Sequence, residues 1–416
     1  MNTIARDLYL QKLIDRRENG SIKVITGIRR CGKSYLLFNL YYKHLLSLGV
    51  RPENILCIPL DDDDYSELRE SKALSAYIKA HIPETGMVYL FLDEVQLCPG
   101  FEGVLNGLNR RENLDIYVTG SNSRFLSSDI LTEFRGRGDE VRVYPLSFAE
   151  FFSAYDGDKY DAWQDYYTYG GLPLILSQKT DEQKSKYLSD LFEKVYLDDI
   201  LERNGLRRDS VMESLINILA SSVGSLTNPN KLANTFKSKG EPVSDKTLGS
   251  YIAHLMDAFL ISKAERYDIK GKKYIASPSK YYFADVGLRN ARLNFRQQEE
   301  NHIMENILYN ELRVRGFNVD VGVVPWHRKG EDGKTQTHLE VDFVCNKGSQ
   351  RYYIQSAFAI PDEAKMAQEQ RSLSLIGDSF KKIIVVRDSI KLWRNEEGIV
   401  IMGILDFLLN PNSLEL

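Results

Sequence analysis

A short stretch near the N-terminus limits what this chain can fold into. Residues 27–34 read Gly-Ile-Arg-Arg-Cys-Gly-Lys-Ser, which fits the pattern G-x-x-x-x-G-K-[ST] of loops that bind phosphate groups. A β-rich run, 21–26, precedes this stretch, and an apolar run, 35–40, follows it. A strand, a glycine loop and a helix in this order are the context that the motif requires. The sequence therefore predicts a phosphate-binding loop between a strand and a helix.

The residue types in this loop suit a nucleoside triphosphate. Glycines let the backbone curl so that successive N–H groups point at phosphate oxygens, and the following helix adds its N-terminal partial positive charge. We expect Lys33 to reach the β- and γ-phosphates and the Ser34 hydroxyl to ligate Mg²⁺. The alternative is a structural glycine loop that matches by chance. The predicted ATP-binding residues are Gly27, Ile28, Arg29, Arg30, Cys31, Gly32, Lys33, Ser34 and Tyr35.

Composition narrows the class of protein. The chain has 416 residues, 43% of them hydrophobic and 27% charged, which is typical of a globular protein of two or three domains. A net charge of -4 excludes a globally basic nucleic-acid binder but leaves a local basic surface open. The apolar runs are too short or too interrupted to span a bilayer, and the dispersed cysteines argue against a zinc site or disulfide framework. We expect a cytoplasmic protein without a membrane partner.

Further strands are predicted downstream of the loop. The apolar runs are 54–60, 87–92, 114–119 and 140–144, and helical segments separate them. Continuous apolar strands that alternate with helices indicate a parallel sheet covered on both faces. The run at 54–60 lies in the sequence between the phosphate loop and strand 87–92, which is the layout of ATPases with an added strand between these two elements.

An acidic pair closes the strand predicted at 87–92. Asp93 and Glu94 follow the apolar residues of this strand directly. We expect Asp93 to hold Mg²⁺ through water and Glu94 to polarise the attacking water as a general base. The alternative is an acidic pair at the start of a surface loop.

Two more polar positions complete the predicted catalytic set. Asn122 follows the strand at 114–119 and can lie beside the γ-phosphate to orient water, with Thr119 and Ser121 as alternatives. A simple Gly-Ser-Asn turn is the structural interpretation of the same residues. Arg137, in preference to Arg135, can be presented to the site of a neighbouring subunit to stabilise charge on the transferred phosphoryl group. Because surface arginines are common, a purely solvent-exposed role remains the alternative.

Several motifs occur in order along the chain: 27–34, Leu92-Asp93-Glu94, Thr119-Gly120-Ser121-Asn122, Gly136-Arg137, 145–151 and 169–173. Together they resemble those of a known family, the prokaryotic AAA-type ATPases that carry a C-terminal restriction-nuclease-like domain of unknown function. The resemblance spans nearly the whole chain and implies an α/β P-loop NTPase with an AAA-like parallel sheet, a helical lid, a winged helix and a PD-(D/E)xK-like domain. It divides the chain into an ATPase core (1–150), a lid and linker (151–209), a winged helix (210–297) and a nuclease-like domain (298–416).

The predicted winged helix is a candidate for binding DNA. The helix that begins near Ser244 would be its recognition helix, and a hairpin with a lysine-rich tip follows it. The alternative is a domain that contacts only proteins, with the lysines on a solvated wing. The lysines predicted to contact phosphates are Lys246, Lys270, Lys272, Lys273 and Lys280.

The predicted nuclease-like domain lacks part of the chemistry that its family resemblance implies. Glu305 and Asp342 fit the acidic positions, but the second strand carboxylate falls on Gln355 and the lysine falls on Ala357. A neutral amide is a poor replacement for a carboxylate ligand, and alanine cannot handle a proton. We therefore expect a non-cleaving domain.

Taken together, these features predict an ATP-hydrolysing, Mg²⁺-dependent AAA-type ATPase with a regulatory or nucleic-acid-associated role, acting as a homo-oligomer or with a protein partner. The competing hypothesis is a nucleotide-gated switch with slow turnover. A metal-dependent DNA nuclease is a third and weaker alternative.

Overall fold

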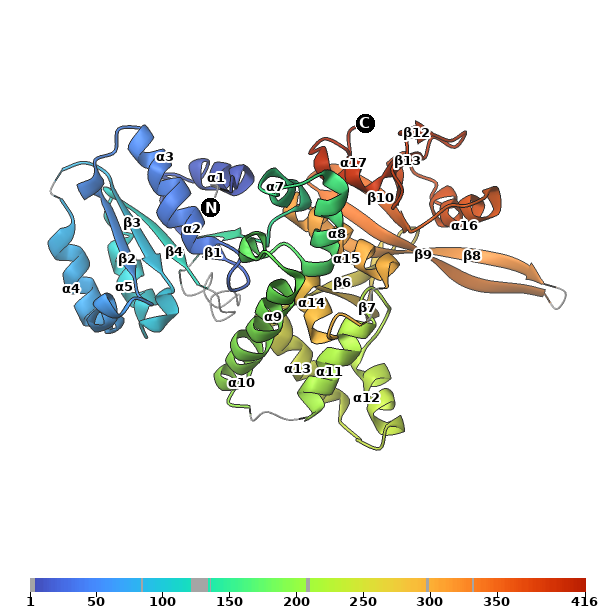
Figure 1. Ribbon diagram of the computed structural model, residues 1–416, viewed down its shortest axis with the longest axis horizontal. Coiled ribbons are helices and arrows are strands. Elements are labelled where there is room, and N and C mark those ends of the chain that lie inside the picture. Colours follow the sequence, from blue (N-terminus) through green and yellow to red (C-terminus); the bar gives the residue numbers. More distant parts are fainter. Residues whose placement is uncertain are drawn as a thin grey trace. The chain divides into compact units, whose positions relative to one another are not determined.

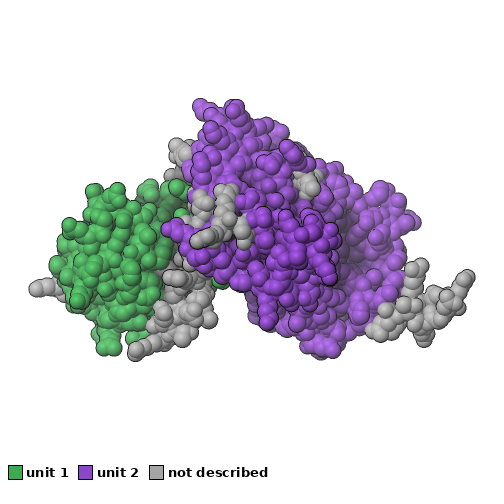
Figure 2. Space-filling view, turned by 90° about the horizontal axis from the view of Figure 1, so that it is seen from below, with its two compact units in different colours: residues 1–145, 257–259 green, residues 146–256, 260–416 purple. Residues whose placement is uncertain are grey.

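The computed structural model of the chain describes residues 4–83, 85–120, 134, 136–206, 210–296, 299–330 and 333–416. The chain forms two compact units (Figure 2). Unit 1 comprises residues 1–145 and 257–259, and unit 2 comprises residues 146–256 and 260–416. Within the described parts of the chain, every helix is too short or too polar to span a bilayer.

Unit 1 is built on a five-stranded sheet in the order β2-β3-β4-β1-β5. All neighbouring strands in it run parallel. β1, β3 and β4 are buried along their whole length, which is why each appears in the sequence as a continuous run rather than an alternating one. The strands are β1 (Ile22–Thr26), β2 (Ile55–Pro59), β3 (Val88–Asp93), β4 (Leu114–Thr119) and β5 (Gly138–Arg142).

The added strand of this sheet is β4, not the strand predicted for that role at 54–60. β4 lies between β1 and β3, whereas β2 forms the edge of the sheet. The prediction relied on order along the chain, and that order does not determine order across a sheet when crossover helices join parallel strands. The placement of β4 brings the ends of β1, β3 and β4 together.

A buried ion pair ties β1 to β4. Lys23 of β1 contacts Asp115 of β4, and both side chains are almost fully buried. The Tyr117 hydroxyl donates to the Asp115 carboxylate at 2.8 Å, which satisfies a further acceptor site. Burial lowers the pKa of Lys23, and the negative charge of Asp115 opposes that effect. Polar groups buried with their partners in this way favour one strand register.

Helices cover both faces of the unit 1 sheet (Figure 1). Leu74 and Leu105 pack into an apolar core on one face, and the Tyr41 ring contacts those of Phe91 and Tyr117 on the other. The helix after the phosphate loop is continuous but includes a π-helical segment, Leu36–Tyr41. The helices are α1 (Asp7–Ile14), α2 (Lys33–Tyr35), α3 (Tyr42–Ser47), α4 (Ser71–His81) and α5 (Phe101–Leu108), with 3₁₀ segments Pro52–Asn54, Asp63–Arg69 and Val95–Leu97.

Unit 2 contains an eight-stranded mixed sheet in the order β12-β13-β11-β10-β9-β8-β6-β7. β6 and β7 form an antiparallel hairpin, and β6 also pairs in parallel with β8. This pairing joins the segment predicted as a winged helix to the segment predicted as nuclease-like. The strands are β6 (Ile261–Asp268), β7 (Lys273–Phe283), β8 (Asn318–Gly330), β9 (Gly333–Lys347), β10 (Gln350–Ala357), β11 (Lys381–Val386), β12 (Trp393–Arg394) and β13 (Val400–Gly403).

The helices of unit 2 precede and flank this sheet. α7 begins at a capping box, because the Ser147 hydroxyl accepts from the Glu150 N–H and the Glu150 carboxylate accepts from the Ser147 N–H. The helices are α7 (Phe148–Ser153), α8 (Lys159–Tyr169), α9 (Asp181–Leu191), α10 (Asp198–Arg203), α11 (Ser210–Ser221), α12 (Pro229–Ser238), α13 (Asp245–Asp257), α14 (Val286–Arg292), α15 (Glu300–Val314), α16 (Glu363–Ser374) and α17 (Ile404–Leu409). Shorter segments are π-helical Phe192–Leu197 and 3₁₀ Pro173–Ser177.

Candidate nucleotide-binding site

The predicted phosphate loop connects β1 to α2 and requires glycine at two positions. Gly27 and Gly32 have φ of 141° and 99°, in the left-handed range that side chains rarely adopt. A Cβ at Gly27 would lie 2.1 Å from the carbonyl oxygen of Val143. The glycines therefore allow both the tight curl of the loop and its close approach to the chain that follows β5.

Lys33 directs its charge into this loop. Its side chain is only 5% exposed, and its ammonium group donates to the carbonyl oxygens of Gly27 at 3.0 Å and Ile28 at 3.2 Å. The lysine therefore folds back over the loop instead of extending into solvent. An ammonium group held there can attract phosphate oxygens.

An arginine just before α1 forms hydrogen bonds with the backbone of the phosphate loop and of the chain after β5. The Arg6 guanidinium donates to the carbonyl oxygens of Cys31 at 3.0 Å and Tyr144 at 2.7 Å. The Cys31 thiol is buried and lies 3.5 Å from the Val143 carbonyl oxygen, so the loop contributes Cys31 to the site through its backbone alone. Sequence reasoning missed Arg6, because no motif marks an arginine so far ahead of the loop.

Asp93, at the end of β3, lies next to the start of the loop helix. Its carboxylate is 5% exposed and accepts a hydrogen bond from the Thr119 hydroxyl. Burial raises the pKa of Asp93, and the nearby hydroxyls of Thr119 and Ser34 oppose the shift. Hydroxyl and carboxylate oxygens are the ligands that Mg²⁺ prefers. Ser34 and Asp93, which were predicted as the metal-binding pair, thus lie close together.

Glu94 follows in a left-handed backbone conformation, with φ of 46°. Its N–H donates to the Thr119 hydroxyl at 3.1 Å, and its carboxylate accepts a hydrogen bond from the amide of Gln96. Thr119 therefore links the predicted metal ligand to the predicted base. Gln96 was not anticipated, because its contact with Glu94 depends on the turn that the chain makes after β3.

The two other predicted catalytic residues are Asn122 and Arg137. Asn122 lies outside the described residues, as does its alternative Ser121, whereas the other alternative, Thr119, contacts Asp93. Arg137 is exposed, and its carbonyl oxygen accepts from the N–H of Ile22 at 2.8 Å, at the start of β1. β1 has five residues and is therefore about 16 Å long. Arg137 thus lies at the end of the strands opposite the end that carries the phosphate loop.

Comparison with known proteins agrees with this geometry. Residues 19–152 match the AAA domain. An uncharacterized protein of Haemophilus influenzae is 35% identical to the chain, and the match covers 98% of each protein. The chain belongs to the AAA-type ATPase family. An uncharacterized protein of Methanocaldococcus jannaschii is 28% identical, over 95% of this AAA-type ATPase and 86% of the relative. Residues 160–299 match a domain of unknown function, DUF8612.

The fold of this AAA-type ATPase also has a counterpart among solved structures. The Walker-type ATPase PABY2304 of Pyrococcus abyssi matches with a TM-score of 0.51 and 16% sequence identity. The match covers 70% of this chain and 96% of that chain. At this identity the likeness supports the fold alone. The resemblance to AAA-type ATPases that the motifs predicted is confirmed.

The lysines predicted to contact DNA differ in their surroundings. Lys246, on α13, and Lys270, Lys272 and Lys273, at the turn between β6 and β7, are exposed. Lys280, on β7, is only 3% exposed and forms ion pairs with carboxylates. The prediction that Lys280 contacts phosphate is wrong, because its ammonium group faces the interior of unit 2 of the AAA-type ATPase.

The residues predicted as a remnant nuclease site lie close to one another. Glu305 and Asp342 share the ammonium group of Lys280, and the Asp342 N–H donates to the Gln355 side-chain oxygen at 3.4 Å. Ala357 belongs to a buried apolar core. The helix and both strands expected from the family resemblance are therefore present, although their chemistry differs.

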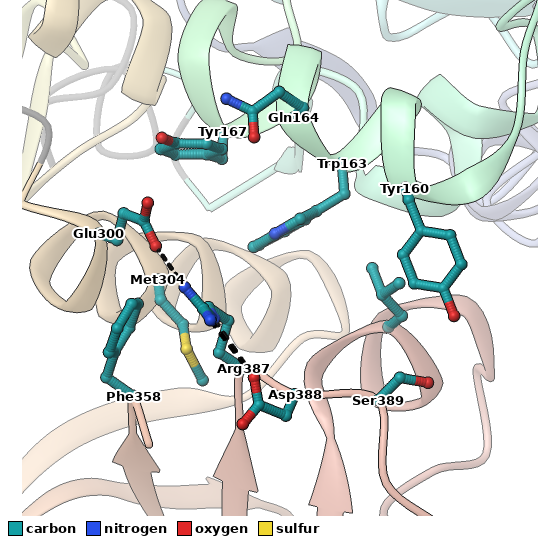
Figure 3. A pocket seen from close by; sticks show the side chains of 11 residues that line it. Tyr160, Trp163, Gln164, Tyr167, Glu300, Met304, Phe358, Arg387, Asp388 and Ser389 are labelled. Atoms are coloured by element: carbon teal, nitrogen blue, oxygen red, sulfur yellow. Dashed lines mark hydrogen bonds and ion pairs between the residues drawn. The ribbon is translucent and has the colours of Figure 1, made fainter.

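Unit 2 of the AAA-type ATPase also holds a pocket of about 320 Å³ between α8 and the ends of β10 and β11 (Figure 3). Trp163, Tyr167 and Phe358 give it aromatic walls. The Arg387 guanidinium donates to Glu300 at 2.9 Å and lies 4.5 Å from the Phe358 ring centroid. The arginine that borders the pocket is thus paired with a carboxylate.

Proposed function

We propose that this AAA-type ATPase binds ATP with Mg²⁺ through Gly27–Tyr35 and hydrolyses it. The proximity of the Ser34 hydroxyl to the Asp93 carboxylate carries the proposal, because it brings the end of the phosphate loop to the end of β3. Mg²⁺ held between these residues would neutralise charge on the phosphates. Lys33 would hold the β- and γ-phosphates, and Glu94 would take a proton from the attacking water. Asn122 or Thr119 would orient that water.

Steady-state phosphate release by the pure full-length protein tests the proposal. We expect release with ATP and Mg²⁺ that stops when EDTA removes the metal, because the triphosphate then loses its counter-charge. Protein that binds a fluorescent ATP analogue but releases no phosphate under any condition would favour the second candidate function below.

The second candidate is a nucleotide-gated switch in which ATP acts as a ligand. The hydrogen bond from Gln96 to the Glu94 carboxylate supports this alternative, because a carboxylate held in this way is less available as a base. Turnover would then be slow until a partner displaced Gln96. Comparison of phosphate release with and without duplex DNA separates constitutive from partner-dependent turnover.

We propose a role in trans for Arg137. We expect Arg137→Ala to slow turnover about tenfold, since one charge-assisted hydrogen bond at an exposed contact contributes about 1.5 kcal/mol. ATP affinity should stay unchanged, because this side chain lies at the edge of the sheet away from the loop of its own subunit. Mixing Arg137→Ala with the binding-deficient Lys33→Ala should restore part of the turnover. In mixed assemblies, Arg137→Ala supplies an intact ATP site and Lys33→Ala supplies the arginine. Normal turnover by Arg137→Ala alone would exclude the role.

We also propose that the hairpin of β6 and β7 contacts DNA. Three helices followed by a hairpin are the element order of a winged helix, and the exposed lysines at the tip suit phosphate contacts. We expect substitution of Lys270, Lys272 and Lys273 by alanine to weaken DNA binding and lower its salt slope by about 3. A variant that loses three exposed lysines elsewhere, Lys43, Lys72 and Lys79, controls for net charge. If both variants lose DNA affinity equally, the lysines contribute only a nonspecific electrostatic attraction to DNA.

A further inference from the structure

A buried lysine lies at the centre of the predicted remnant nuclease site. Lys280, on β7, has its ammonium nitrogen 2.8 Å from Glu305, 2.6 Å from Glu340 and 3.4 Å from Asp342. The three acids come from α15 and β9, so the lysine reaches them from a different part of the chain. Its side chain is 4% exposed, which leaves little room for water as a competing partner.

In this cluster the number of N–H donors on the lysine equals the number of carboxylates around it. An ammonium group has three N–H donors, and each of the three carboxylates offers an acceptor within reach. Glu305 also accepts from the Tyr282 hydroxyl at 2.6 Å. The second oxygen of Asp342 accepts from the Ser356 N–H at 2.9 Å. Besides the lysine, protein donors therefore orient the carboxylates of Glu305 and Asp342.

A nuclease of the resembled class would need a metal ion here, and the residues present do not fit one. The amide of Gln355 and the methyl group of Ala357 stand where a carboxylate and a lysine are required. With the Lys280 ammonium group in place, no group of three histidine, cysteine or acidic side chains among the described residues has an arrangement that can hold a metal ion. The negative charge of Glu305 and Asp342 is balanced by Lys280 instead.

We infer that the ammonium group of Lys280 is the resident cation of this site and takes the place of a metal ion. Although burial opposes the charge of the lysine, the neighbouring Glu305, Asp342 and Glu340 raise its pKa above the ordinary value. The lysine therefore stays protonated at neutral pH. It joins β7, α15 and β9 into one rigid group and leaves the site without the metal that phosphodiester cleavage requires.

Mn²⁺ binding to nucleotide-free, full-length protein tests this inference, with free Mn²⁺ measured by electron paramagnetic resonance. We expect wild type to bind no Mn²⁺ that depends on Asp342, whereas Lys280→Met gains about one equivalent with a Kd near 10⁻⁴ M, as weak oxygen-ligand sites have. Lys263→Met removes a lysine from the paired strand β6, where Lys263 contacts Glu265 at 2.8 Å, and should gain none. Mn²⁺ bound at the phosphate loop is common to all three proteins and cancels in the comparison.

Three results would overturn the inference: Mn²⁺ binding by wild type that is lost in Asp342→Asn, plasmid cleavage by wild type with Mn²⁺, and a folded Lys280→Met that gains no Mn²⁺ site. Should Lys280→Met fail to fold, the double variant Lys280→Met/Glu305→Gln provides the measurement. We expect the double variant to fold, because it buries one unpaired carboxylate fewer. A double variant that also fails to fold contradicts a charge-balancing lysine as well.

Discussion

Replacement of Lys33 by alanine should abolish measurable ATP binding at micromolar protein. The ammonium group is buried against the carbonyl oxygens of Gly27 and Ile28, where it is positioned to meet phosphate oxygens. Loss of charge-assisted hydrogen bonds from such a group costs about 2–4 kcal/mol, which is roughly 30- to 1,000-fold in Kd. Titration with a fluorescent ATP analogue measures the change directly.

The neighbouring helix provides a matched control for this substitution. Lys43 lies on α3, in the same continuous helix, and its side chain is exposed. Lys43→Ala removes an equal charge at similar helix propensity, so we expect its ATP affinity to stay within about twofold of wild type. If Lys33→Ala binds the analogue as tightly as Lys43→Ala, the assignment of the phosphate loop is wrong.

Local sequence patterns predicted the unit 1 strands well, for a physical reason. A strand buried on both faces is mostly apolar, so β3 and β4 were visible as apolar runs, interrupted within β4 by Asp115, with ends within a residue of those observed. The glycines of the loop and the acidic pair after β3 were equally visible, because each is required at a strand end. The order of the strands across the sheet was not, since it depends on crossover paths that no local pattern records.

Lys280 illustrates what the sequence could not provide. The prediction that Lys280 contacts phosphate followed from the lysines at the tip of the same hairpin. The partners that bury it, Glu305 and Asp342, lie 25 and 62 residues away in the chain. One signal was present: Lys280 begins the run Lys-Tyr-Tyr-Phe, and the apolar residues after it indicate that this end of β7 is buried. A lysine in such a run needs a buried carboxylate partner.

Gln96 marks a second limit of sequence reasoning, and it bears on mechanism. Its amide donates to the Glu94 carboxylate across a turn that requires the left-handed conformation of Glu94. A side-chain amide two residues after an acid has no sequence signature. The contact nevertheless bears on whether the predicted base is available, and so on the choice between an active ATPase and a switch.

Replacement of Glu94 by glutamine should therefore separate binding from chemistry. The substitution preserves size and removes only the ability to accept a proton, so we expect turnover to fall by about 10²- to 10⁴-fold. ATP affinity should change little, because Lys33, Ser34 and Asp93 still make the contacts proposed for the phosphates and metal. Phosphate release measures the first effect, and titration with the ATP analogue measures the second.

A companion variant distinguishes the loss of a base from the loss of a local hydrogen bond. Gln96→Ala breaks the contact between Gln96 and Glu94 but leaves the carboxylate free to act on water. If Glu94 is the base, Gln96→Ala should turn over ATP at or above the wild-type rate while Glu94→Gln is inactive. If both variants lose turnover equally, the contact itself matters for the site and Glu94 is not the base. If neither loses turnover, water activation must come from another group, and Thr119, which contacts both Asp93 and the Glu94 backbone, becomes the residue to replace next.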